Sequence, residues 1–284
     1  MRDIAHGLAA RGLDDDCAVL DFDGEALVLT HDMMVAGVHY LPEQDPADVA
    51  WKLVASNLSD LAAKGAEPLG VLLGYQLGPD PTRFLTGLRE ALDHYGTLLL
   101  GGDTVGAGEA GGIAQTLGLT AIGRATHRPV PGRNGARPGD TLWLTGAVGG
   151  AMIGLAALRA GTGDSLAYRR PQARLSEGIA LAPHVTAIMD VSDGLLLDGL
   201  RLAKASGVAL AIDQATVPLA CPEAQRDAAL RWGDDYELLF TLPTGTPCPV
   251  AATRIGTVLA GPAGTLSVGG EALIAPEGLG FTHG

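Results

Sequence analysis

Seven aspartates lie directly before or after short apolar segments, where side chains from different strands can converge in a folded chain. They are Asp16, Asp32, Asp60, Asp103, Asp190, Asp193 and Asp234. Each one alone is equally well explained as a turn or cap residue, because aspartate hydrogen-bonds to nearby backbone N–H groups. Glycines next to Asp103 and Asp193 allow a ligand or a second backbone to approach closely. Together, these positions favour a shared site over seven unrelated turns.

Carboxylates that converge in a protein interior repel one another, so such a cluster needs cations. Aspartate oxygens, without accompanying clusters of histidine or thiolate, favour Mg²⁺ over zinc. Mg²⁺ bound by carboxylates is commonly shared with substrate phosphates. The residue types therefore predict Mg²⁺-dependent chemistry on phosphorylated ligands, and by themselves they carry the prediction no further.

The composition narrows the class of protein. The chain has 284 residues, 47% of them hydrophobic and 18% charged, which is typical of a compact globular fold. Its net charge of −13 argues against nucleic acid as a partner, since that backbone requires a basic surface. Cys17, Cys221 and Cys248 have no metal-binding spacing, so we expect reduced thiols in a cytoplasmic protein. No apolar segment approaches the ~20 residues of a membrane helix, and we expect no membrane partner.

One helix is expected to position Asp60. It is predicted over residues 45–64, with Asp45 as N-cap, Pro46 at the first helical position and Gly65 at its end. On a helical wheel its residues separate into two sides. The apolar side holds Trp51, Val54, Leu58, Leu61 and Ala62, and the polar side holds Lys52, Ser56, Asn57, Asp60 and Lys64. The polar side is either the solvated face of an amphipathic helix or part of a functional site.

The other elements follow from apolar runs and turn residues. In the first half we predict helices at 2–13, 45–64 and 82–95, strands at 17–20, 26–29, 70–77, 97–100 and 116–123, and a glycine-rich loop at 106–112. Residues 124–140 are rich in Arg, Pro and Gly and are typical of a domain junction. In the second half we predict strands at 141–145, 187–189, 208–212, 238–242 and 254–258, and helices at 149–160, 171–181 and from Gly194 to about Ser206.

This order of elements predicts an α+β fold with helices on one face of the first sheet. We expect two domains, an N-terminal domain over residues 1–125 and a C-terminal domain over residues 138–284 that closes the site.

Six segments, taken together and in this order, resemble thiamine-monophosphate kinases, which belong to the superfamily of aminoimidazole-ribonucleotide synthetase. The segments are Asp15-Asp16-Cys17-Ala18-Val19-Leu20, Asp32 with Val35-Ala36-Gly37-Val38-His39-Tyr40, Asn57-Leu58-Ser59-Asp60-Leu61-Ala62-Ala63, Gly101-Gly102-Asp103-Thr104, Val191-Ser192-Asp193-Gly194-Leu195 and Asp235-Tyr236-Glu237-Leu238-Leu239-Phe240. The last segment is the most specific to the family.

The resemblance implies a reaction of ATP with thiamine monophosphate that gives ADP and thiamine diphosphate. It implies Mg²⁺ ligands, several ions per site, at Asp16, Thr30, Asp32, Asp60, Asp190 and Asp193. It implies an ATP site formed by Tyr95, Gly102, Asp103, Arg133 and Ser192, and contacts to thiamine phosphate from His39 and Asp234. It also implies a homodimer in which two N-terminal sheets form a barrel, and a C-terminal α/β sandwich.

The chemistry of this reaction agrees with the residue types. The acceptor is a phosphate whose second pKa is about 6, so it is largely ionised near neutral pH and requires no general base. Two polyanions need metal ions and in-line alignment in order to react.

Two other interpretations remain open. One is another ATP-using enzyme of the same superfamily, similar to aminoimidazole-ribonucleotide synthetase. The other is a non-catalytic Mg-nucleotide-binding relative.

His31, which replaces a small hydroxyl residue next to Asp32, is a departure from the family pattern that we expect to affect metal coordination.

Overall fold

The computed structural model describes residues 7–106 and 114–282. Residues 2–6 of the first predicted helix and residues 107–112 of the predicted loop lie outside the described residues. The remainder of that first helix is a 3₁₀ helix, Leu8–Leu13.

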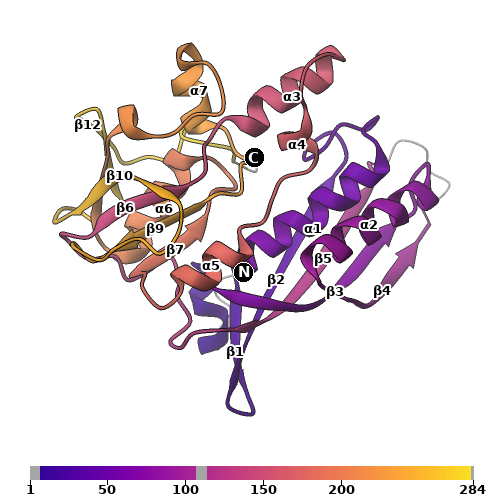
Figure 1. Ribbon diagram of the computed structural model, residues 1–284, viewed down its shortest axis with the longest axis horizontal. Coiled ribbons are helices and arrows are strands. Elements are labelled where there is room, and N and C mark those ends of the chain that lie inside the picture. Colours follow the sequence, from indigo (N-terminus) through magenta and orange to yellow (C-terminus); the bar gives the residue numbers. More distant parts are fainter. Residues whose placement is uncertain (1–6, 107–113, 283–284) are drawn as a thin grey trace.

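The described part of the first half forms one sheet of five strands in the order β1-β2-β5-β3-β4 (Figure 1). The strands are β1 (Ala18–Phe22), β2 (Glu25–Val35), β3 (Ala66–Gln76), β4 (Leu99–Val105) and β5 (Thr116–Ala125). β3 and β4 pair in parallel, whereas the other neighbours are antiparallel. β2 is longer than predicted, so Thr30 and Asp32 lie inside the strand and, two residues apart, face the same side of the sheet.

Helices α1 (Pro46–Ala62) and α2 (Pro81–Tyr95) cover one face of this sheet, as predicted. The Asp45 carboxylate accepts a hydrogen bond from the Ala47 N–H at 2.9 Å and caps α1, and Asp80 caps α2 in the same way. Apolar side chains of both helices pack on the alternate strand residues that face them. On the opposite face, among the residues that the structure describes, Phe22, Met33 and Leu72 are exposed.

The polar side of α1 is not solvated. Lys52, Asn57 and Lys64 are fully buried, and Ser56 and Asp60 are nearly so. The explanation of α1 as an ordinary amphipathic helix is therefore wrong, because α1 lies between the first sheet and the second half of the chain (Figure 1).

The second half forms a sheet whose order among the described strands is β12-β11-β8-β10-β6-β9-β7. Its strands are β6 (Thr141–Thr145), β7 (Ala187–Asp190), β8 (Ala209–Ile212), β9 (Leu238–Leu242), β10 (Ala252–Leu259), β11 (Thr265–Val268) and β12 (Glu271–Leu273). Its helices are α3 (Gly150–Ala160), α4 (Leu166–Arg169), α5 (Leu175–Leu181), α6 (Leu195–Ser206) and α7 (Arg226–Arg231). Helix α6 packs on one face of the sheet, and α5 with the end of α1 packs on the other.

The α+β fold is thus confirmed, with local differences from the prediction. The helix predicted at 171–181 begins only at Leu175, because Pro171 lies in an extended segment after α4. The sequence analysis does not predict α4, α7, β11 and β12, since each is too short to produce a clear periodic pattern. None of the described helices is long and apolar enough to cross a membrane.

The two halves touch through small residues. A Cβ at Gly178 in α5 would lie 2.0 Å from the Ala62 carbonyl oxygen, and a Cβ at Gly65 would lie 2.4 Å from the Ala182 Cβ. Helix α5 therefore packs directly on the backbone at the end of α1. This contact determines how the second half is placed against Asp60, which is two residues before Ala62.

We predict that Gly178→Ala lowers the free energy of unfolding by about 2 kcal/mol, the usual scale of overpacking. Alanine favours a helix over glycine by ~1 kcal/mol, so helix propensity alone would stabilise the variant. A loss of stability would therefore identify the interhelical clash as its cause. Urea denaturation measures the change. Ser176→Ala, an exposed position in the same helix, should change stability by less than about 0.5 kcal/mol. A stabilised Gly178→Ala variant would contradict the prediction.

Candidate functional site

Three carboxylates converge where the two halves meet. Asp16 precedes β1, Asp60 lies in the last turns of α1 and Asp190 ends β7. One carboxylate oxygen from each lies within 4.8 Å of the others. We call these three residues the acidic cluster. Because both halves contribute, the cluster exists only when the halves are docked.

Two further predicted ligands lie beside the acidic cluster. The Thr30 hydroxyl donates to the Asp60 Oδ2 at 2.5 Å. Asp32 is on the same face of β2, where its backbone N–H donates to the Asn57 Oδ1 at 3.0 Å, and its charge raises the pKa of Asp60. Five of the six predicted metal ligands are therefore brought together.

Two cations of the chain contact the acidic cluster at Asp16. The Lys64 ammonium, itself fully buried, lies 2.8 Å from the Asp16 Oδ2 and 2.7 Å from the Asp15 Oδ1. The Arg133 guanidinium pairs with the Asp16 Oδ1 from the other side. Burial alone would raise the pKa of Asp16, but Lys64 and Arg133 outweigh it and hold that pKa below its usual range.

The other two members of the cluster behave in the opposite way. Burial, followed by the charges of Asp32, Asp190 and Asp16, raises the pKa of Asp60 well above its usual range. Burial, and then the charge of Asp16, raises the pKa of Asp190 to about 8. Without a cation, both carboxyls therefore keep their protons to higher pH than an ordinary aspartate does. The Asp190 Oδ2 accepts a short hydrogen bond from the Ser59 hydroxyl at 2.6 Å.

These donors fit a hard divalent cation. Carboxylate oxygens and a threonine hydroxyl are ligands that Mg²⁺ accepts, and a bound cation would displace the protons from Asp60 and Asp190. The fit rests on the donor types and on the mutual distances of 4.8 Å or less between carboxylate oxygens of Asp16, Asp60 and Asp190.

Asp193, the sixth predicted ligand, is held apart from the acidic cluster by an ion pair. Its Oδ2 accepts from the Arg201 Nη1 at 2.5 Å. The turn that carries it is fixed by Asp198, whose buried Oδ2 accepts from the backbone N–H groups of residues 192, 193 and 194 at 3.0–3.1 Å. The turn is thus rigid, whereas the Asp193 side chain, which is partly exposed, depends on Arg201 for its orientation.

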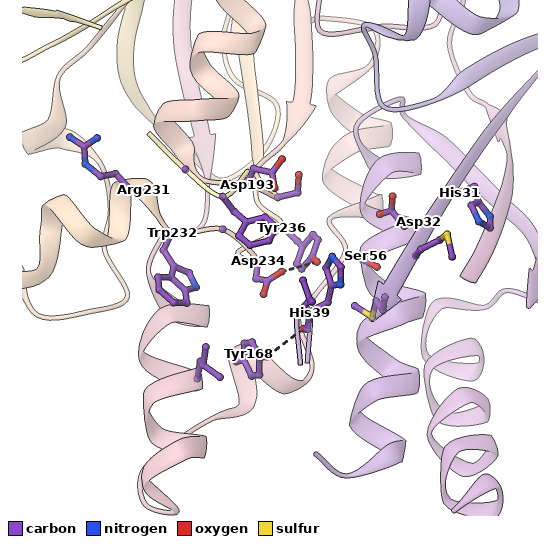
Figure 2. A pocket seen from close by; sticks show the side chains of 18 of the residues that line it. His31, Asp32, His39, Ser56, Tyr168, Asp193, Arg231, Trp232, Asp234 and Tyr236 are labelled. Carbon is purple, nitrogen blue, oxygen red and sulfur yellow. Dashed lines mark hydrogen bonds between the residues drawn. The ribbon is translucent and has the colours of Figure 1, made fainter. Parts of the chain in front are cut away.

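A cavity of about 890 Å³ opens on one side of this turn (Figure 2). It is lined by aromatic rings and by a few polar groups, as the labelled side chains in Figure 2 show. These include His39, Tyr168, Trp232, Asp234, Tyr236 and Phe281, together with Asp32, Ser192 and Asp193. We call this the aromatic pocket. Such a lining suits a flat heterocycle that carries a polar group at one end.

A second cavity, of about 1040 Å³, opens on the other side of the turn. Its polar lining is mainly basic, and we call it the basic pocket. It includes Arg11, Asp14, Asp15, Arg133, Arg201 and Lys204, beside the apolar Leu197 and Leu200. Asp193 in the first pocket and Arg201 in the second form the ion pair between them. A positive pocket with an apolar wall suits a polyphosphate attached to a ring.

Other predicted site residues lie elsewhere in the chain. Gly102 and Asp103 are on β4, the exposed edge strand, which β5 and β3 separate from β2. Tyr95 ends α2, where its hydroxyl accepts from the Ala173 N–H at 3.0 Å. None of the three lines either pocket. His31 points away from Asp32, as alternation along β2 requires, and bonds to the Thr120 hydroxyl at 2.9 Å, so it does not face the cluster.

Of the cations near the site, the sequence interpretation gives a role only to Arg133, which it assigns to ATP. Lys52 and Lys64 were placed on the polar side of α1 without a role, and Arg201 was not considered. A signal was available, because several carboxylates predicted to converge require nearby positive charge. Asp198 gave no such signal, since an aspartate in the first turn of a helix is ordinary.

Both halves of the chain match known domain families. Residues 14–125 match the AIR synthase related protein, N-terminal domain, and residues 137–269 match the AIR synthase related protein, C-terminal domain. The sheets, the docked helices and the carboxylates between them thus define a protein of the AIR synthase related class.

Individual relatives narrow this class. The thiamine-monophosphate kinase of Escherichia coli strain K12 is 38% identical over 82% of this chain and 76% of its own. The thiamine-monophosphate kinase of Caulobacter vibrioides is 38% identical over 89% of this chain and 76% of its own. A solved structure, AaThiL complexed with AMPPCP and TMP, superposes with a TM-score of 0.82 at 28% identity, covering 94% of this chain and 92% of that one. The chain belongs to the thiamine-monophosphate kinase family, and the resemblance seen in its motifs is confirmed.

We predict that the metal-free protein loses stability as the pH rises from about 4 to about 8. The pKa of Asp190 is about 8 in the folded protein and 3.8 is its ordinary value, so over this range the folded chain keeps a proton that the unfolded chain has released. Rising pH therefore favours unfolding. Urea denaturation with a chelator present measures the slope.

Asp190→Asn should show a smaller fall in stability over the same range. The pKa values of Asp198 and Asp235 are each raised by burial to about 7, but both groups remain in the variant and cancel in the comparison. Equal slopes for the two proteins would contradict the assignment.

Proposed function

We propose that this protein transfers the terminal phosphoryl group of ATP to thiamine monophosphate and so forms ADP and thiamine diphosphate. The observation that carries the proposal is the position of the carboxylates between two pockets of different chemistry. Ser192 and Asp193 reach the aromatic pocket, Asp15 and Arg133 reach the basic pocket, and the acidic cluster lies where they approach each other.

The basic pocket is assigned to ATP. The Arg133 Nε is buried and, among the described residues, has no hydrogen-bond acceptor, which a phosphate oxygen would supply. Arg201 and Lys204 add positive charge along the same wall. Ser192, on the turn between the pockets, is assigned to the phosphates.

The aromatic pocket is assigned to thiamine monophosphate. Trp232 and Phe281 offer faces for its two rings, and the Asp234 carboxylate suits a cationic or N–H-bearing ring. His39 accepts from the Val35 N–H through its Nδ1 at 3.0 Å, which places the ring proton on Nε2. We assign His39, as a residue of the pocket wall, to the substrate phosphate. The structure of AaThiL was solved as a complex with AMPPCP and TMP. This complex supports the assignment of two separate ligand sites to this protein.

We assign Mg²⁺ to Asp16, Thr30, Asp32, Asp60 and Asp190, and Asp193 would join these ligands if a phosphate took its place as the partner of Arg201. Bound there, Mg²⁺ would neutralise the two phosphates and let them approach in line. The residues of the chain have the remaining roles. The acidic cluster would fix the positions of the ions, and the two pockets would orient the phosphoryl donor and the acceptor. The acceptor phosphate is already ionised, so the chain need not supply a base.

A homodimer is proposed from the face of the first sheet opposite α1 and α2. Phe22, Met33 and Leu72 expose 66%, 54% and 40% of their surface there, on three different strands. Monomeric proteins rarely expose so extended an apolar face. Pairing of two such faces would also bring a second chain close to the edge strand β4, so we assign the ATP role of Gly102 and Asp103 to the dimer. Tyr95 lies on the helix-covered side of the sheet, and its ATP role stays a prediction. Free thiols and the use of ATP support a cytoplasmic location.

Incubation with ATP, Mg²⁺ and thiamine monophosphate should yield thiamine diphosphate, detected by chromatography. Asp60→Asn should reduce turnover by about a hundredfold or more, because the loss of one group that stabilises charge in the transition state typically has an effect of this size. It should leave the fold intact, because the protonated Asp60 and an asparagine offer similar hydrogen bonds. Asp213→Asn, an exposed cap in the second half, is the matched control and should remain active. Wild-type-like rates in Asp60→Asn would remove it from the metal site.

Leu72→Glu should convert the dimer into a folded monomer, because a charge in the centre of an apolar interface is costly to bury. Sedimentation velocity distinguishes the two masses. A wild-type protein that sediments as a monomer, or a variant that stays dimeric, would contradict the assignment of this face.

A further inference from the structure

Lys52 is a fully buried lysine in the middle of α1 whose ammonium group is completely coordinated by the protein. It donates to the Asp234 Oδ2 at 2.7 Å and to the His39 carbonyl oxygen at 3.0 Å. It also lies 4.0 Å above the centre of the Tyr168 ring. An ammonium group has three N–H donors, and these partners account for three directions. Lys52 therefore has no donor left for a substrate phosphate.

The three partners come from distant parts of the sequence. His39 belongs to the connection between β2 and α1, Tyr168 to α4, and Asp234 to the segment before β9. Each of them lines the aromatic pocket, but Lys52 does not. Ser56, one helical turn further along α1, does reach the pocket (Figure 2). Lys52 thus lies behind the pocket wall and holds three of its residues from the back.

The segment that carries Asp234 has an unusual backbone. Asp234 and Tyr236 both adopt positive φ, at +68° and +53°, although neither is glycine. Hydrogen bonds hold this conformation, from the Asp234 N–H to the Ser192 carbonyl oxygen at 2.8 Å and from the Tyr236 N–H to the Val191 carbonyl oxygen at 2.9 Å. Strain of this kind persists only where the surroundings over-determine it, and it concentrates at ligand sites.

Both oxygens of the Asp234 carboxylate have defined partners. Oδ2 accepts from Lys52, and Oδ1 accepts from the Tyr236 hydroxyl at 3.1 Å. The carboxylate is nevertheless about one-third exposed to the pocket. Its orientation is therefore fixed from behind by Lys52, while one edge remains accessible to a ligand. The positive charge of Lys52 also offsets the charge that Asp234 would otherwise present to an approaching phosphate.

We propose that Lys52 is a positioning residue for the acceptor substrate: it orients Asp234 and the His39 connection so that the aromatic pocket accepts the rings and phosphate of thiamine monophosphate. This inference rests on the proposed function. It predicts that Lys52 affects acceptor recognition selectively, because its contacts lead to the aromatic pocket and not to the basic pocket.

Lys52→Met is the direct test, since methionine fills the apolar part of the site and removes only the charge and the donors. The KM for thiamine monophosphate should rise by about tenfold or more, the loss expected for one charged hydrogen bond. The kcat and the KM for ATP should stay within about twofold, and they serve as the internal control. Equal changes in both KM values, or an unchanged KM for thiamine monophosphate, would overturn the proposal.

A double variant tests whether Lys52 acts through Asp234. If it does, Lys52→Met should add little to the KM effect of Asp234→Asn, because the two residues belong to one interaction. Fully additive effects would overturn the proposed route. A thermal melting curve checks that Lys52→Met is folded. If Lys52→Met is not folded, the single variant Asp234→Asn is the test. An unaltered KM for thiamine monophosphate in Asp234→Asn would also overturn the proposal.

The outcomes separate this inference from the proposed function. A wild-type protein that phosphorylates thiamine monophosphate, with a Lys52→Met variant that recognises it equally well, would refute the role of Lys52 only. A wild-type protein that neither binds nor phosphorylates thiamine monophosphate in calorimetry and in the turnover assay would refute both.

Discussion

The mutual repulsion of Asp16, Asp60 and Asp190 is the constraint on which the arrangement of this protein depends. They come from three segments and from both halves of the chain, so packing of α5 on the end of α1 forces them together. Lys64 and Arg133 offset the charge at Asp16, and protons offset it at Asp60 and Asp190. A site assembled in this way is prepared for divalent cations, which would replace the protons without rearranging the backbone.

Two pockets of different chemistry lie beside this charged centre. The basic pocket offers mainly guanidinium and ammonium groups, whereas the aromatic pocket offers rings together with the carboxylates of Asp32, Asp193 and Asp234. The rigid turn at residues 191–194, capped by Asp198, separates the two pockets. Phosphoryl transfer between two phosphates depends mainly on alignment and on charge neutralisation. A protein that supplies two binding pockets and a cluster of carboxylates between them meets those requirements.

Helix α1 connects all of these features. Its end places Asp60 and Lys64 at the acidic cluster, and its middle places Lys52 behind the aromatic pocket. Both lysines are fully buried, which is costly unless each charge is paired. Each one is paired with aspartates, Lys64 with Asp15 and Asp16 and Lys52 with Asp234. A single helix thus fixes the geometry of the acidic cluster and of the aromatic pocket relative to each other.

The sequence by itself determined the local features of the chain. Asp45, Pro46 and Gly65 delimit α1, because caps and helix starts depend only on neighbouring residues. The ordered motifs also identified the family and indicated the aspartates that the fold brings together. Only the tertiary structure decided the environment of Lys52 and Lys64, which a helical wheel assigns to a polar side without saying whether water or another domain covers it. It likewise decided that Gly102 and Asp103 lie within β4 and not beyond it, because pairing with β3 extends that strand. Burial and strand pairing depend on segments far apart in the sequence, and local patterns carry no information about those contacts.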